Sequence, residues 1–111
     1  MSNYNYKETL EIYDRLVNMN PNFERKGKTM PYTSANGYMF SLLNKDGELG
    51  IRLPKESGRR FMEKYQSGIF KSHGAVMKDY VLIPDELLNY LELLIEYLEI
   101  SFKYVISLPP K

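Results

Sequence analysis

The 111-residue chain contains no cysteine and a single histidine, and its 15 basic and 14 acidic side chains leave a net charge of only +1. Without cysteine, disulfide bonds and thiolate metal sites are excluded, and packing alone must hold a core together. This absence fits an intracellular protein, and we expect a cytoplasmic location. The small net charge excludes a global field that attracts nucleic acid or anionic lipid, so such binding needs a local patch.

Long apolar segments are also missing. Residues 1–15 hold no apolar block of signal-peptide length, and Glu92, Glu96 and Glu99 interrupt the leucine-rich stretch near the C-terminus. We expect neither stretch to enter a membrane. What the chain does contain, 43% hydrophobic and 26% charged residues, is typical of a folded protein, and its length suits one domain spanning residues 1–111.

Periodic patterns predict a continuous α+β unit. Apolar residues at helical spacing predict a first helix over residues 5–19, and residues 23–33 read as a polar edge strand. Residues 37–44 and 48–54 read as two strands joined by a tight turn at Asp46-Gly47. A second helix begins at Pro54, with Phe61, Met62 and Tyr65 facing inward. A strand over residues 74–84 and a last helix from residue 85 to about 108 follow.

Glycines in the stretch from Lys45 to Phe61 raise the question of a phosphate-binding loop. Their spacing, at positions 47, 50 and 58, fits neither the Walker loop nor the dinucleotide fingerprint. Asp-Gly between two strand-like runs is instead a strong hairpin signal. We therefore interpret this stretch as a hairpin followed by a helix.

Two basic clusters suggest an alternative function as a nucleic-acid-binding module. If they lay on one side of the sheet they would form a patch for phosphates, beside which Tyr32, Tyr38 and Phe40 are candidates for base stacking. A solvated helix face explains the second cluster equally simply. The residues concerned are Arg25, Lys26, Lys28, Arg59 and Arg60.

Catalysis and metal binding find little support in the sequence. His73 lacks a second histidine at metal-binding spacing, and the adjacent Ser72 would point to the opposite face of an extended segment. Asp79 is unusual in an apolar strand, and an edge or strand-end position explains it more simply than acid catalysis. We expect no metal, no cofactor and no enzyme activity, and rank a small-molecule-binding protein or enzyme last.

The last helix shows more apolar surface than one small sheet needs. A narrow polar stripe, which contains Glu92, Glu96 and Lys103, separates a leucine-rich face from a second face rich in tyrosine. Because tyrosine tolerates both water and a dry interface, the second face suits a partner, most simply another copy of the chain. The alternative is that the first helix covers it. The predicted interface residues are Tyr90, Leu93, Tyr97, Ile100 and Tyr104.

Several strings from residue 28 onward resemble stand-alone proteins related to the N-terminal domain of TfoX, the bacterial competence regulator. They are "KTMPYTSANGYMFSLL", "KDGELGIRLP", "HGAVMKDYVLIPDELL" and "SFKYVISLPPK". The resemblance implies a two-layer sandwich on an antiparallel sheet of about five strands, in the order α-β-β-β-α-β-β-α, with a non-enzymatic regulatory or interaction role. In similar proteins an aspartate often stands near the position of Glu99, where the last helix would restart.

Together these observations give a first hypothesis of a cytoplasmic, bacterial-type α+β domain that works by protein contact as a homodimer or with another protein. Nucleic-acid binding is the second hypothesis. No membrane contact is expected.

Overall fold

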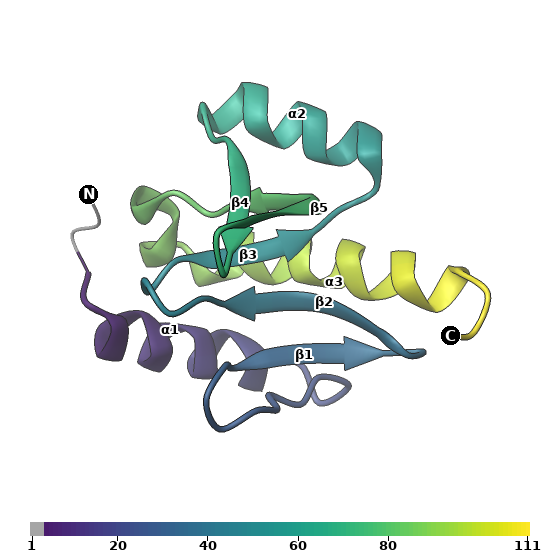
Figure 1. Ribbon diagram of the computed structural model, residues 1–111, viewed down its shortest axis with the longest axis horizontal. Helices are drawn as coiled ribbons and strands as arrows, with labels where there is room; N and C mark the ends of the chain where they lie inside the picture. Colours follow the sequence, from purple (N-terminus) through teal and green to yellow (C-terminus); the bar gives the residue numbers. More distant parts are fainter. Residues whose placement is uncertain (1–3) are drawn as a thin grey trace.

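Three α-helices and five strands follow one another in the predicted order along residues 4–111, which the computed structural model describes (Figure 1). The strands are antiparallel and the helices pack on the sheet, which confirms the α+β prediction. The elements are α1 (Tyr6–Asn18), β1 (Tyr32–Ala35), β2 (Tyr38–Leu43), β3 (Leu49–Arg52), α2 (Lys55–Tyr65), β4 (Ile69–Ser72), β5 (Ala75–Leu82), a 3-10 helix η1 (Asp85–Asn89) and α3 (Leu91–Ser107).

Local sequence chemistry sets several of these boundaries. Asn5 caps α1 and exchanges hydrogen bonds with Glu8, so that two backbone N–H groups at the helix start are satisfied. Gly47 adopts the positive φ of +81° that the tight turn between β2 and β3 requires, and its N–H donates to the carbonyl of Asn44. The second helix was predicted to begin at Pro54, and in the structure Pro54 is the N-cap residue directly before α2.

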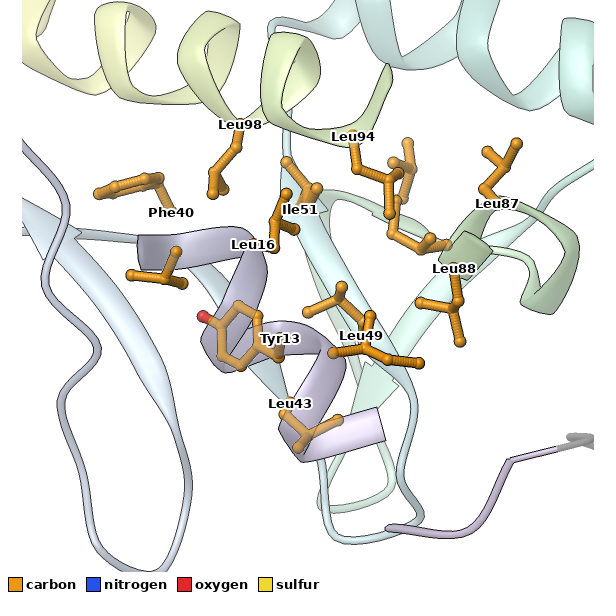
Figure 2. Packing of buried hydrophobic residues seen from close by; sticks show 14 of the residues in the cluster. Tyr13, Leu16, Phe40, Leu43, Leu49, Ile51, Leu87, Leu88, Leu94 and Leu98 are labelled. Carbon is orange, nitrogen blue, oxygen red and sulfur yellow. The ribbon is translucent and has the colours of Figure 1, made fainter. Parts of the chain in front are cut away.

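The helix side of the sheet holds the main core. Strand order is β1-β2-β3-β5-β4, and α3 lies across β2 and β3 with α1 beside it. Figure 2 shows Leu94 and Leu98 of α3 pointing toward Leu49 and Ile51 of β3, and all four side chains are buried. Ser101 lets α3 approach β2 closely, because its hydroxyl donates to the Phe40 carbonyl at 3.0 Å.

A bulge in β2 increases the number of its side chains that reach this core. Thr33 pairs with Ser41 and Ser34 pairs with Met39, so Phe40 is an extra residue. Ser41 hydrogen-bonds the hydroxyl of Tyr13 at 2.6 Å, while the neighbouring Phe40 ring packs on Phe102 of α3. Two successive residues of one strand therefore contact the helix layer.

The opposite face is partly closed by β4 and β5. His73 and Gly74 form a two-residue turn with φ of 53° and 76°, the signature of a type I′ hairpin. Phe70 of β4 is fully buried, and its ring lies where a side chain at Gly50 of β3 would be. The Asn44 side chain also donates to the Lys71 carbonyl at 2.8 Å. The hairpin therefore bends back over β3 and the β2–β3 turn.

Asp79 explains how β5 bends. Lys71 pairs with Val76 and Ile69 pairs with Val81, so the single residue between them on β4 faces residues 77–80 of β5. Within this bulge Asp79 adopts a left-handed φ of 69°, and its carbonyl accepts from the Leu53 N–H at 2.9 Å. Aspartate tolerates this conformation better than most residues. Asp79 therefore has a conformational role. The expectation of an edge or strand-end position was wrong, because β5 lies between β3 and β4 and Asp79 is inside it.

The last segment differs from the single helix predicted for residues 85–108. The 3-10 helix η1 comes first, Tyr90 interrupts the helical backbone with φ −119° and ψ 68°, and α3 then continues to Ser107. Leu87 and Leu88 are adjacent in sequence and both buried, an arrangement that the tighter helix and the break accommodate. The helix does not restart at Glu99, which lies inside α3.

A smaller difference concerns the first strand. Of the predicted edge strand over residues 23–33, only an isolated Lys26–Tyr32 bridge and the start of β1 are extended pairings. Within residues 4–111, no helix is long and apolar enough to cross a membrane.

Candidate functional site

The predicted interface on α3 is partly covered within the chain, and Tyr97 shows this most clearly. Its ring packs perpendicular to Phe61 of α2, with 4.9 Å between centroids, and lies 6.2 Å from Tyr65. Burial, together with the hydrogen bond to Tyr65, raises the pKa of Tyr97 to about 12. Helix α2, and not the first helix, therefore covers this part of α3.

Tyr104 is also engaged inside the molecule. The Arg52 guanidinium lies 5.4 Å from the Tyr104 ring centroid and 5.6 Å from that of Tyr38, so two aromatic faces stabilise its charge. Leu93 is half-buried against the main core. These contacts leave little of the predicted tyrosine-rich face free on the central turns of α3.

Two of the five predicted residues remain well exposed. Tyr90 is 61% exposed at the break before α3, and Ile100 is 39% exposed. Ile100 lies beside the polar stripe, whose members Glu92, Glu96 and Lys103 are also exposed. The accessible side of α3 is therefore mainly acidic, with two exposed apolar residues, Ile100 and Ile106. The helical pattern alone did not reveal this, because it does not include the elements that pack on the helix.

The first basic cluster lies in the loop between α1 and β1. Arg25 forms an ion pair with Asp14 of α1 at 2.7 Å, and this hydrogen bond raises the pKa of Arg25. Its Nη1 also donates to the carbonyl of Gly27. Lys26 and Lys28 are exposed. Arg25 is thus occupied in holding the loop against α1.

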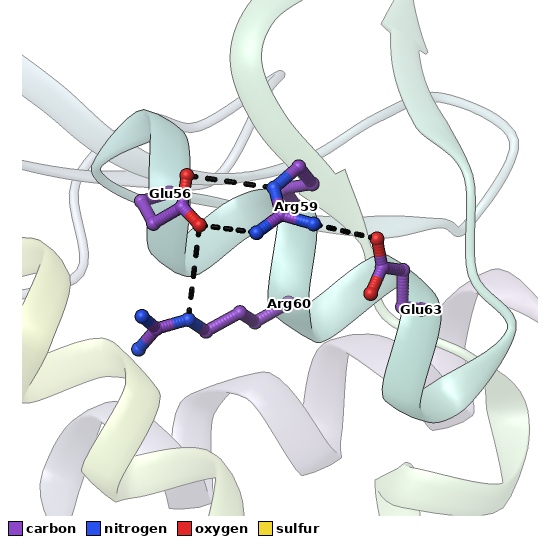
Figure 3. Close-up of polar contacts among 4 residues, drawn as sticks. All are labelled: Glu56, Arg59, Arg60 and Glu63. Carbon is purple, nitrogen blue, oxygen red and sulfur yellow. Dashed lines mark hydrogen bonds and ion pairs between the residues drawn. The ribbon is translucent and has the colours of Figure 1, made fainter.

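The second basic cluster lies on α2 and is neutralised by acids (Figure 3). Arg59 bridges Glu56 and Glu63, with 2.7 Å to the latter, and Arg60 approaches Glu56 at 3.9 Å. The hydrogen bond from Arg59 lowers the pKa of the Glu56 carboxyl. In Figure 1 α2 lies above the sheet and the loop after α1 lies below it, so the two clusters do not form one patch.

The two residues considered for catalysis, His73 and Asp79, lie in different surroundings. His73 is exposed in the turn between β4 and β5. Asp79 is half-buried in the β5 bulge. Within residues 4–111, no three histidine or acidic side chains gather as a metal site would require.

A groove with a volume of about 710 Å³ lies between α2 and the β4–β5 hairpin, and apolar residues form most of its lining. It was not predicted from the sequence. Ile69 and Val76 stand at its side, 53% and 56% exposed. Its apolar walls include Leu53, Met62, Ile69, Val76, Met77 and Val81.

Gly58 lies where α2 packs on β5, at the side of the groove. It is buried, and a Cβ at this position would lie 3.5 Å from Val81 and 3.9 Å from Leu53, which is ordinary van der Waals contact. A side chain larger than a methyl group would occupy part of the groove, whose wall is formed by Met62 on the next turn of α2. The signal in the sequence was a small residue inside an amphipathic helix, facing a strand.

Charged residues surround this apolar floor. Lys55, Glu56 and Arg59 line it from α2, and Lys78 and Asp79 line it from β5. Glu56 and Arg59 already pair with each other, whereas neither lysine forms an ion pair with any residue in the range 4–111. The groove thus offers an apolar floor and two available cations.

No protein-family model matches the chain, and no curated protein matches its sequence. The resemblance to the TfoX N-terminal domain stays a prediction.

Proposed function

We propose that this chain is a non-enzymatic protein-interaction domain that associates with itself and has a regulatory role in the cytoplasm of a bacterium. The resemblance to TfoX-like proteins supports the regulatory role. The observation that carries the proposal is the pair of aliphatic side chains, Ile69 and Val76, each more than half exposed beside an apolar groove. Contiguous exposed apolar surface of this kind is characteristic of interaction sites.

Charge supports protein contact over nucleic-acid binding. Three of the five residues proposed for phosphate contacts, Arg25, Arg59 and Arg60, lie within 4 Å of carboxylates. Binding a phosphate there would require these ion pairs to be broken, whereas the groove needs no such rearrangement.

Sedimentation velocity tests the proposal directly. The wild type should shift from monomer to larger species as its concentration rises from low to high micromolar. Val76→Glu should weaken this association, because a carboxylate would be placed at the apolar wall. Met19→Glu is the matched control, since Met19 is 42% exposed at the end of α1, outside the groove. A wild type that stays monomeric throughout would refute the proposal.

The α3 surface needs a variant that leaves the contacts inside the molecule intact. Tyr97→Glu would disrupt the contacts with Phe61 and Tyr65, so a loss of association would follow from damage to the fold. Ile100→Glu alters an exposed residue of the same predicted face. It therefore separates association from folding.

A further inference from the structure

We propose, building on the self-association proposed above, that the exposed side of α3 in one copy binds the groove beside α2 in a second copy. The contact would join two different surfaces, head to tail.

The groove presents two lysines and an aliphatic floor, and among the described residues Asp79 is its one lining carboxylate outside the ion pairs of Glu56. Lys55 and Lys78 at its rim are exposed and have no carboxylate partner within the range 4–111, while Glu56 is held by Arg59 and Arg60. Between the lysines the floor is aliphatic. A complementary segment therefore carries acidic side chains next to an apolar one.

The outer side of α3 presents this combination. Glu92, Glu96 and Ile100 are spaced four residues apart, so they lie in one line along the helix. All three are exposed, and neither glutamate forms an ion pair with a residue of the described chain. The stripe thus offers two free carboxylates followed by a free aliphatic side chain.

The lengths of the two surfaces agree. The eight steps from Glu92 to Ile100 span about 12 Å at 1.5 Å per residue, and the 11 residues of α2 that flank the groove span about 16 Å. A stripe of this length fits beside α2, with the glutamates near the rim lysines and Ile100 against Ile69 and Val76. The partner helix would extend the helix layer over the uncovered end of the sheet.

The symmetry of this contact has a measurable consequence. No residue of α3 lines the groove in its own chain, so each copy keeps a free stripe and a free groove after binding once. Such heterologous contacts continue into rings or chains of molecules. We therefore expect association to continue beyond the dimer as the concentration rises.

A mixing experiment tests the pairing. Val76→Glu damages the groove and Ile100→Glu damages the stripe, so each variant alone should associate about tenfold or more weakly than the wild type. Mixed in equal amounts, they should form a dimer and nothing larger, because the intact stripe of one fits the intact groove of the other. Sedimentation velocity measures the masses, and circular dichroism verifies that both variants are folded.

Charge reversal supplies a second, independent readout. Glu96→Lys should weaken association by about tenfold, and mixing it with Lys78→Glu should recover part of this loss. If the wild type associates but neither mixture forms a dimer, the head-to-tail pairing is wrong while the proposed self-association stands. If the wild type remains monomeric, both proposals are wrong.

Discussion

Helices cover one face of the sheet, whereas the opposite face is partly covered by a hairpin of the sheet itself. The helix-side core is built from large apolar side chains at regular spacing, such as Leu94 and Leu98 of α3. The smaller cluster on the other face is centred on Leu42, Phe70 and Tyr80, with partly buried methionines around it. The helix-side core depends on side-chain volume, whereas the cluster around Phe70 depends also on unusual backbone conformations.

Removing one large side chain from each face should give the largest effects. Leu98→Ala is expected to lower the free energy of unfolding by about 2–5 kcal/mol and Phe70→Ala by about 3–5 kcal/mol, because both side chains are fully buried. Urea denaturation measures both losses.

Hydrogen exchange then distinguishes the two faces. In Phe70→Ala, amides of β4 and β5 should exchange faster than those of α3, because the ring holds the hairpin against Gly50. In Leu98→Ala the protection should fall across the whole core. Equal loss of protection everywhere in both variants would mean that the hairpin is not a separate unit.

Substituting two glycines by alanine tests where the fold requires a residue without a side chain. The two substitutions should change the free energy of unfolding in opposite directions. A methyl group at Gly50 would lie 2.5 Å from the Phe70 ring, so Gly50→Ala should destabilise the protein by about 1–3 kcal/mol. Gly58→Ala makes only ordinary contacts inside α2 and should stabilise it by about 0.5–1 kcal/mol. Thermal unfolding measures both, and a stable Gly50→Ala would show that the ring moves aside freely.

The helix-side elements were largely predictable from the sequence. Alternation in β3, the Asp-Gly turn and the helical spacing in α1 are local signals, and each matches the structure. Of the two strands after α2, β5 was predicted directly as the strand over residues 74–84, whereas β4 was expected only from the resemblance in element order. The residues of β4 by themselves are few and stand between glycines, which left no periodicity to detect.

The candidate site was less predictable, because it depends on contacts between distant elements. The helical pattern assigned Tyr97 to a free face, yet Phe61 lies against it. The groove arises from the position of α2 beside a bulged strand, and Asp79, which marks that bulge, read only as an odd residue. Ring packing and strand bending are tertiary effects that spacing does not encode.

The bend in β5 can be tested at Asp79. Asp79→Val should destabilise the protein by about 1–2 kcal/mol, because a β-branched residue resists the left-handed φ of 69°. Asp79→Gly removes the same carboxylate but accepts this conformation, so it should retain close to wild-type stability. Urea denaturation compares them. Equal losses in both variants would assign the effect to the carboxylate and not to the backbone.

The smallest losses of stability are expected when the hydroxyl is removed from one buried tyrosine on each face of the sheet. Tyr13 shares a hydrogen bond with the Ser41 hydroxyl, and Tyr80 donates to the Met39 carbonyl at 2.9 Å. Tyr13→Phe and Tyr80→Phe should each cost about 0.5–1.5 kcal/mol at neutral pH. Burial raises the pKa of both hydroxyls above the ordinary value of 10.0.

The raised pKa of these two tyrosines determines whether the free energy of unfolding rises or falls in alkaline solution. Above about pH 10 the unfolded tyrosines release protons while the folded ones keep theirs, so the free energy of unfolding should fall as pH rises. Each Phe variant removes one such group, and its stability should therefore decline less steeply than that of the wild type. Urea denaturation between neutral pH and about pH 11 measures the slopes. If Tyr13→Phe alone flattened the curve, the Tyr80 hydroxyl would have to be accessible to solvent, and the hairpin would not close its face of the sheet.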